Sequence, residues 1–265
     1  MSILPLLHHL IPFVLVAFRL AGIFALTPLL SSTMLPRQAK IAFLLTLAAL
    51  VYPTVPASYT SAPLPTTLFG LLPLIVSEAL VGLIIGAIAA VPLITLEMSG
   101  TIMGQQMGFG LARVYNPEMD TDVDILGQLL FFMGTGTFLV MGGLEILLTT
   151  LVGTFRTIPM GRLAMGDAPL DLYVAVFGQG VERSMRCAMP VVATILILVV
   201  IFGVVGKTMP QINIMSVGFM FKILAGIAVF ALALPHVGNA IGEKLADTSR
   251  AVQLWAAEPP LAHAP

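Results

Sequence analysis

The sequence predicts an all-α, multi-pass membrane protein. Of its 265 residues, 58% are hydrophobic and 9% are charged, whereas an ordinary soluble domain is about 25% charged. The mean hydropathy is +1.03. Charged residues divide the chain into about six apolar blocks, and a block of about 20 residues can cross the hydrocarbon core of a bilayer. Because helices satisfy their own backbone hydrogen bonds in lipid, we expect membrane helices, several of them bent hairpins.

The six blocks follow one another along the whole chain. They cover residues 3–30, 41–51, 67–98, 125–155, 187–206 and 214–241. An uncharged loop rich in proline and serine follows the second block, and residues 242–265 regain charge as an amphipathic polar tail. No composition change marks a separate soluble domain, so we expect one membrane-embedded domain over residues 1–265.

Charge and motif content exclude several classes of function. The formal net charge is −1, so the chain has no basic field that could hold nucleic acid. The glycines of Gly108-Phe109-Gly110 are followed by Arg113 where a dinucleotide-binding loop needs a third glycine. Other catalytic motifs are absent from the sequence, and its four histidines have no carboxylate at ligand spacing. We therefore expect no catalytic site, no metal site and no cofactor.

An acidic loop precedes the fourth block. Its carboxylates alternate at Asp120, Asp122 and Asp124, as they do at the start of a calcium-binding loop. The sixth position is Ile125 instead of glycine and the twelfth is Phe131 instead of glutamate, so an EF-hand is excluded. We expect Asp122 or Asp124 to cap the helix that begins near Ile125.

Ionisable residues inside the apolar blocks are the first functional candidates, because each is costly in hydrocarbon unless it faces protein or water. They are Arg19, Glu78, Glu97, Glu145 and Lys222. Two interpretations stay open for each: it lines a translocation path, or neighbouring subunits satisfy it and thereby fix how the helices assemble.

Small residues at four-residue spacing predict close helix contacts. Gly82 and Gly86 lie in the third block, beginning one turn after Glu78. Gly218 and Gly226 flank Lys222 on one helix face. We expect this second face to pack closely on a neighbour, where Lys222 meets a carboxylate or a row of backbone carbonyls.

The segment between the third and fourth blocks is glycine-rich and polar, which does not favour a long regular helix. At membrane depth such a segment must line a cavity or be buried in protein. Its composition suits a weakly structured, movable plug, and the alternative is a bent helix packed on a partner. The plug or pore candidates are Gly104, Gln105, Gln106, Met107, Gly108, Phe109 and Gly110.

Several strings in the sequence resemble one known family. They are Gly-Phe-Gly, Asn-Pro and Leu-Gly-Gln within 108–128, Phe-Arg-Thr-Ile-Pro-Met-Gly at 155–161, Met-Pro-Gln-Ile-Asn at 209–213 and Gly-Phe-Met-Phe-Lys-Ile-Leu-Ala-Gly at 218–226. Together with the length and block order, they are similar to the FliR family of flagellar export-gate proteins. One departure is Met220, where the family usually has a proline two residues before the lysine.

The resemblance implies a non-enzymatic subunit of the bacterial inner membrane and flagellar basal body. It implies a FliP-like N-terminal part and a FliQ-like C-terminal part that assemble with FliP and FliQ in a helical export gate. Unfolded flagellar subunits would pass through this gate, a loop of the chain would help to plug it, and FlhB and FlhA would be functional neighbours.

Two alternatives remain beside the flagellar subunit. The related subunit of virulence injectisomes shares the Pro-Gln-x-Asn string and the following lysine. A small-solute secondary transporter belongs to a different class and would predict broken helices at matching positions in two repeats. The sequence shows no such internal pairing.

Overall fold

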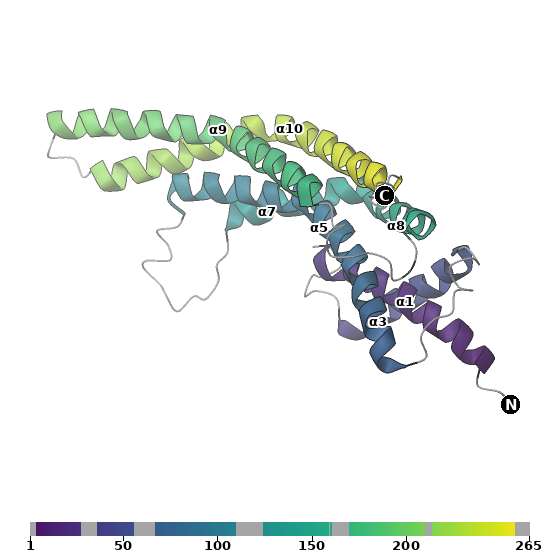
Figure 1. Ribbon diagram of the computed structural model, residues 1–265. Helices are drawn as coiled ribbons and strands as arrows, with labels where there is room; N and C mark the ends of the chain where they lie inside the picture. The colour runs from purple at the N-terminus through teal and green to yellow at the C-terminus, as the bar shows by residue number, and fades with distance from the viewer. Residues whose placement is uncertain are drawn as a thin grey trace. The chain divides into compact units, whose positions relative to one another are not determined.

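The computed structural model describes residues 4–27, 36–55, 67–109, 124–158, 160, 170–209 and 214–257. Every regular element among these residues is helical, which confirms the all-α prediction. The elements are α1 (Leu4–Leu26), α3 (Arg37–Val51), the short 3₁₀ helix η1 (Tyr52–Thr54), α5 (Leu68–Met107), α7 (Ile125–Val140), α8 (Gly143–Thr157), α9 (Leu170–Thr208) and α10 (Ile214–Ala257) (Figure 1).

The chain is a multi-pass membrane protein. Among the described residues, four helices are long and apolar enough to cross a bilayer: α1, α5, α9 and α10. The pair α7 and α8 qualifies as a fifth, broken span. The second apolar block gives only the 15 residues of α3, about 22 Å of helix, which is shorter than the hydrocarbon core.

Three helices extend beyond the apolar blocks that predict them. Helix α9 begins at Leu170, although its block begins only at Cys187, and α5 continues to Met107. Helix α10 continues through Ala257, so much of the polar tail prolongs a membrane helix. Hydropathy marks only the apolar part of each helix, because glutamate, arginine and glutamine are also good helix formers.

The chain divides into two compact units, each built from separate stretches of sequence. Unit 1 comprises Met1–Val91, Gly142–Phe177 and Ala246–Pro265, and unit 2 comprises Pro92–Met141 and Gly178–Leu245. Three of the boundaries between them fall at Pro92, Gly142 and Gly178, residue types that weaken a helix. Gly142 has a φ of +72°, and it separates α7 from α8.

In unit 1, α1 packs along α3 (Figure 1). The rings of Phe24 and Phe43 lie 5.7 Å apart, and those of Phe13 and Tyr52 lie 6.0 Å apart. His9 Nδ1 and Tyr52 Oη form a hydrogen bond of 2.9 Å. These contacts fix α3, which at 15 residues is too short to be stable alone, against the longer α1.

In unit 2, α9 and α10 form a helical hairpin (Figure 1), in which the rings of Phe202 and Phe221 lie 5.6 Å apart. Only 17% of the residues in the α9 span and in the α10 span are buried. Leu196, Val200 and Leu224 are among the large side chains exposed there. The hairpin therefore presents apolar surface that lipid or another protein must cover.

Candidate functional site

A fully buried ion pair joins α1 to α5. Arg19 Nε donates to Glu78 Oε2 at 2.5 Å, and both side chains are 0% exposed. The two remaining guanidinium nitrogens reach the C-terminal end of α8: Nη1 donates to Thr154 Oγ1 at 3.1 Å and Nη2 to the Ile158 carbonyl at 3.4 Å. All three nitrogens of the cation therefore have acceptors within unit 1.

The residues around Arg19 complete its environment. The Thr154 hydroxyl accepts from Arg19 and donates to the Leu151 carbonyl at 2.6 Å. The Phe155 ring lies 4.1 Å from the guanidinium carbon, a cation–π contact. Ile158 directly follows α8, where the negative end of the helix dipole favours a cation. One charge thus binds α1, α5 and α8 together.

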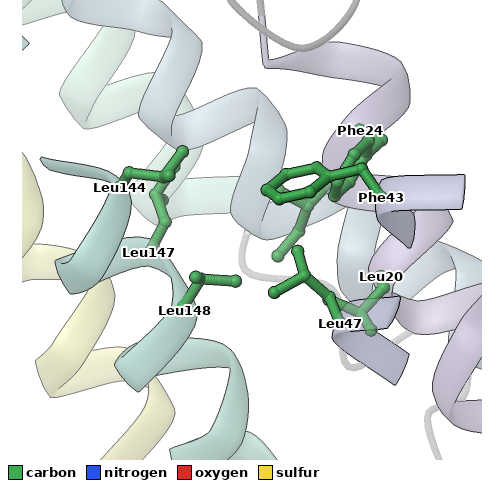
Figure 2. A pocket seen from close by; sticks show the side chains of 8 residues that line it. Leu20, Phe24, Phe43, Leu47, Leu144, Leu147 and Leu148 are labelled. Carbon is green, nitrogen blue, oxygen red and sulfur yellow. The ribbon is translucent and has the colours of Figure 1, made fainter. Parts of the chain in front are cut away.

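An apolar pocket adjoins this cluster through Leu20, the neighbour of Arg19 in the sequence. Its side chains come from α1, α3 and α8 and face one another in Figure 2. They are Leu20, Ile23, Phe24, Phe43, Leu47, Leu144, Leu147 and Leu148. None of these side chains is polar, so the pocket offers no substitute partner to a charge nearby.

The structure pairs Arg19 with Glu78 inside one chain, whereas the sequence suggested a translocation path or a partner in a neighbouring subunit. Neither side chain reaches the surface, so neither lines a path in this conformation. Their partners belong to the same chain instead of to a neighbouring subunit. The sequence alone does not indicate this pairing, because Glu78 lies 59 residues after Arg19.

Close backbone contact accompanies the ion pair. A Cβ on Gly82 would overlap the carbonyl oxygen of Arg19, and one on Gly22 would lie 2.6 Å from the amide nitrogen of Leu83. A Cβ on Gly86 would lie 3.1 Å from the Cα of Ile23. Glycine at these positions therefore lets α1 and α5 approach until their backbones touch, as the spacing of Gly82 and Gly86 predicts for a helix contact.

The glycine-rich segment after the third block begins as a regular helix. Helix α5 includes Gly104, Gln105, Gln106 and Met107, so the expectation of no long helix there is wrong. The reason is tertiary packing: a Cβ on Gly100 would lie 2.5 Å from the Cα of Gly127 on α7. Close approach of α5 and α7 compensates the low helix propensity of glycine. Gly110 lies outside the described residues.

Helix α5 ends at Met107, and the next residue, Gly108, has a φ of +94°. The Phe109 amide donates to the Gly104 carbonyl at 3.1 Å, and the Gly108 amide donates to the Gln105 carbonyl at 3.1 Å. This pair of bonds is a Schellman motif, which needs a residue that tolerates positive φ. Gln105 and Gln106 are exposed, whereas Met107 is fully buried. Gly104–Met107 thus form the packed last turn of α5, and Gly108 and Phe109 follow it.

Asp124 caps α7, as the acidic loop predicts. Its Oδ1 accepts from the Gly127 amide at 3.4 Å. The same oxygen would lie 2.8 Å from a Cβ on Gly104, so the cap also contacts the last turn of α5. The carboxylate stabilises α7 through the free amides and the positive end of the helix dipole.

Residues 10–248 match the profile of the family described as bacterial export proteins, family 1. The chain belongs to this family. Relatives named FliR and SpaR are similar to this export protein. The flagellar biosynthetic protein FliR of Escherichia coli K12 is 24% identical over 239 residues, which cover 86% of this chain and 89% of the relative. The FliR protein of Bacillus subtilis 168 is 26% identical, covering 84% and 85%.

A relative named SpaR has about the same sequence identity to this export protein as the two FliR proteins. The surface presentation of antigens protein SpaR of Salmonella typhimurium LT2 is 26% identical over 230 residues, which cover 86% of this chain and 84% of the relative. Because coverage is high on both sides, the similarity extends over the membrane helices of the export protein as a whole.

The other three charges of the export protein lie in different settings. Glu97 is exposed on α5, and Glu145 is exposed in the first turn of α8, where the helix dipole favours a carboxylate. Lys222 is half-buried on α10, and the described part of the chain gives it no hydrogen bond or ion pair. Its flanking glycines pack inside the chain: Gly218 faces Phe202, and Gly226 faces Met107.

Sequence reasoning missed several members of the buried cluster in this export protein. Thr154 and Phe155 in the last turn of α8, and Ile158 directly after it, carry no charge that would mark them in the sequence. Gly22 lies three residues after Arg19, and so on the same helix face. A small residue at that spacing from an intramembrane charge is a usable signal for a close helix crossing.

Proposed function

We propose that the chain is a structural subunit of a type III protein export gate and catalyses no reaction. In this proposal it lies in the bacterial inner membrane at the flagellar basal body and assembles with FliP and FliQ. Unfolded flagellar subunits cross the membrane through the gate, with FlhB and FlhA as neighbours. The observation that carries the proposal is the family match over residues 10–248, which covers the candidate membrane spans of the described residues except for His9, the first residue of the first span.

The exposed surface of α10 supports an assembled state. Lys222 lies within the span Met215–Leu234, and Phe221 and Leu224 beside it are exposed. An ammonium among apolar side chains needs an acceptor, and the described residues of this chain supply none. A carboxylate or backbone carbonyls of FliP or FliQ would meet this need and fix their position on α10.

Replacement of Lys222 tests this assembly. We expect Lys222→Met to lower the FliP and FliQ retained by a tagged chain from solubilised membranes by about tenfold or more, because it leaves a buried acceptor unpaired. Lys222→Arg, which keeps the charge, should retain most of both partners. The measurement is quantitative mass spectrometry of every protein that copurifies.

Lys207→Met is the matched control, because Lys207 is an exposed lysine in the last turn of α9. It should leave partner retention unchanged. Equal retention by Lys222→Met and Lys222→Arg would contradict a role for the charge. Isolation of the unaltered chain as a folded, monodisperse protein without partners would contradict the export-gate proposal as a whole.

The plug is the second part of the proposal. The chain leaves α5 at Gly108, and Met107 before it is held in place by packing. A closed gate must block ions and an open one must admit a polypeptide, which favours a barrier that moves at low cost. We assign this barrier to the candidate segment Gly104–Gly110, in which Gly104–Met107 form the base as the last turn of α5 and Phe109 is the first bulky group after it.

Replacement of residues 109–115 by glycine and serine tests the plug and spares both α5 and the Asp124 cap. We expect the purified complex to keep its partners and to conduct ions in planar bilayers when no substrate is present. The same replacement at 57–63, in the loop rich in proline and serine, is the control and should stay closed. If the 109–115 variant assembles normally and conducts no more ions than the unaltered complex, the plug assignment is contradicted.

An injectisome subunit is the alternative, and the similarity to SpaR, at 26% identity, is the observation that favours it. The Gly218-Phe219 pair ahead of Lys222 resembles the flagellar branch. Loss of swimming in a deletion strain would support the flagellar role. Retained swimming with loss of injectisome secretion would support the alternative.

A further inference from the structure

The apolar pocket of unit 1 runs from the interior of the unit to its surface. Helix α8 forms one wall, and α1 and α3 form the other, so that Leu148 and Leu47 face each other across the space in Figure 2. Leu20 is fully buried, whereas the Phe43 ring is 42% exposed. All the lining residues belong to unit 1. A ligand can therefore enter beside α3 without any change within this unit.

The size and chemistry of the pocket favour a slender hydrocarbon ligand. Its volume is about 280 Å³ including its open side, below the about 300–1,000 Å³ of sites that enclose compact small molecules. Every lining side chain is leucine, isoleucine or phenylalanine. A polar group that entered would lose its hydrogen bonds to water and gain none. The acyl chain of a membrane lipid has the required shape and no polar atom beyond its ester.

Two cations lie on α3 next to the pocket. Lys40 precedes Phe43 by three residues and Leu47 by seven, so these three positions share one face of the helix. Arg37, the first residue of α3, lies one turn before Lys40 and is exposed. At 1.5 Å per residue, the two cations lie about 5–15 Å before the pocket residues along the helix axis. The phosphate of a phospholipid is displaced from its acyl chains in the same way.

The charges of the three pocket helices favour an anion at this end of α3. Helices α1 and α3 contain no aspartate or glutamate, and the carboxylate of α8, Glu145, is exposed in its first turn. The N-cap residue Pro36 makes no side-chain hydrogen bond to the first amides of α3. The positive end of the helix dipole therefore adds to the charges of Arg37 and Lys40.

We propose that the pocket binds one acyl chain of an anionic phospholipid, whose phosphate lies at Arg37 and Lys40. The acyl chain fills the space between α3 and α8, and the two cations select the negative headgroup. Large side chains elsewhere on α3, such as Ile41 and Leu50, are exposed and would face further lipid. The inference goes beyond the export-gate proposal, because it applies equally to a flagellar and to an injectisome subunit.

Photolabelling with two lipids that differ only in their headgroup tests the proposal. The purified complex is placed in phosphatidylcholine bilayers that contain a trace of phosphatidylglycerol or phosphatidylcholine, each with a diazirine near the end of one acyl chain. Mass spectrometry then identifies the labelled residues. We expect the phosphatidylglycerol probe to label the pocket residues about fivefold more than the phosphatidylcholine probe, because the cations attract its headgroup.

Removal of the two cations should abolish this preference. Arg37→Gln combined with Lys40→Gln should lower labelling by phosphatidylglycerol to the level of phosphatidylcholine. Lys207→Gln is the matched control, since Lys207 is exposed in the last turn of α9, and it should leave the preference unchanged.

A larger side chain in the pocket should exclude both probes. Leu47→Trp places an indole between α3 and α8, so most of the labelling by either lipid should be lost. Leu45→Trp is the matched control, because Leu45 is 46% exposed on the same helix and does not line the pocket. If Leu47→Trp fails to accumulate, Leu144→Phe on the opposite wall provides the same test.

Three outcomes would overturn the lipid site. Equal labelling of the pocket by the two probes would contradict recognition of the anionic headgroup. Labelling that Leu47→Trp and Leu144→Phe leave unchanged would place the acyl chain elsewhere. Label on exposed residues of α9 without label in the pocket would show that a partner protein or a second copy of the chain covers it. Failure of the export-gate proposal would appear in partner retention instead, which none of these measurements uses.

Discussion

Glu78→Gln should destabilise unit 1 by about 3–5 kcal/mol, because removal of one partner leaves the other charge buried and uncompensated. The amide keeps the size of the side chain, so the loss of stability measures the contribution of the charge. Water cannot solvate the unpaired Arg19 guanidinium, since both side chains are fully buried. We expect a large fall in the amount of chain that accumulates in membranes, and a lower midpoint of thermal unfolding for any complex recovered.

The chain contains a matched control for this change. Arg186 and Glu182 form an ion pair of 2.7 Å at 77% and 61% side-chain exposure, so Glu182→Gln should cost no more than about 0.5 kcal/mol. Arg19→Met combined with Glu78→Met should be less harmful than either single change, because no charge stays unpaired. Equal effects of Glu78→Gln and Glu182→Gln would contradict the role of the buried pair.

Gly82→Ala should have the second largest effect. Its Cβ would overlap the carbonyl oxygen of Arg19, and a backbone atom cannot move aside as the end of a side chain can. Helices α1 and α5 would have to separate, at a cost of about 1–3 kcal/mol or more. The separation would also lengthen the Arg19–Glu78 contact, so the two losses should not be additive in a double variant.

Gly153→Ala should change the free energy of unfolding in the opposite direction, although it also replaces glycine by alanine. Gly153 lies within α8, and nothing lies within 4 Å of a Cβ there. Alanine should therefore stabilise the helix by about 0.5–1 kcal/mol. Thermal unfolding of the two purified variants measures the difference, and a Gly82→Ala protein as stable as Gly153→Ala would contradict the close helix contact.

Helix type and membrane class could be predicted from the sequence, because apolar block length and low charge directly reflect the solvent of a chain. A cap at Asp122 or Asp124 was also predictable, since capping depends only on neighbouring residues, and the structure assigns it to Asp124. Helix ends were not: α9 begins well before Cys187, because polar helix formers extend a membrane helix without any hydropathy signal. The helical state of Gly104–Met107 depends on packing against α7 and α10, which composition cannot indicate.

The partners of the charges were the least predictable part of the candidate site. Arg19, Glu78 and Thr154 lie on three helices, and no local pattern brings them together. The glycine spacing at Gly82 predicted a close contact without naming α1 as its partner. Pairing across such distances depends on the tertiary fold, so intramembrane charges indicate where a partner is needed and not which residue supplies it.

The wide sequence spacing of the Arg19 cluster has a consequence for biosynthesis. Glu78 is synthesised 59 residues after Arg19, and Thr154 is synthesised 135 residues after it. At about 5–20 residues per second, the guanidinium waits about 7 to 27 s for the threonine. The charge itself is unneutralised for a shorter time, because Glu78 follows Arg19 after about 3 to 12 s at the same rate. Until then water, lipid phosphate or an insertion factor must hold the cation, so the nascent chain is most vulnerable to mispairing and degradation before Glu78 emerges.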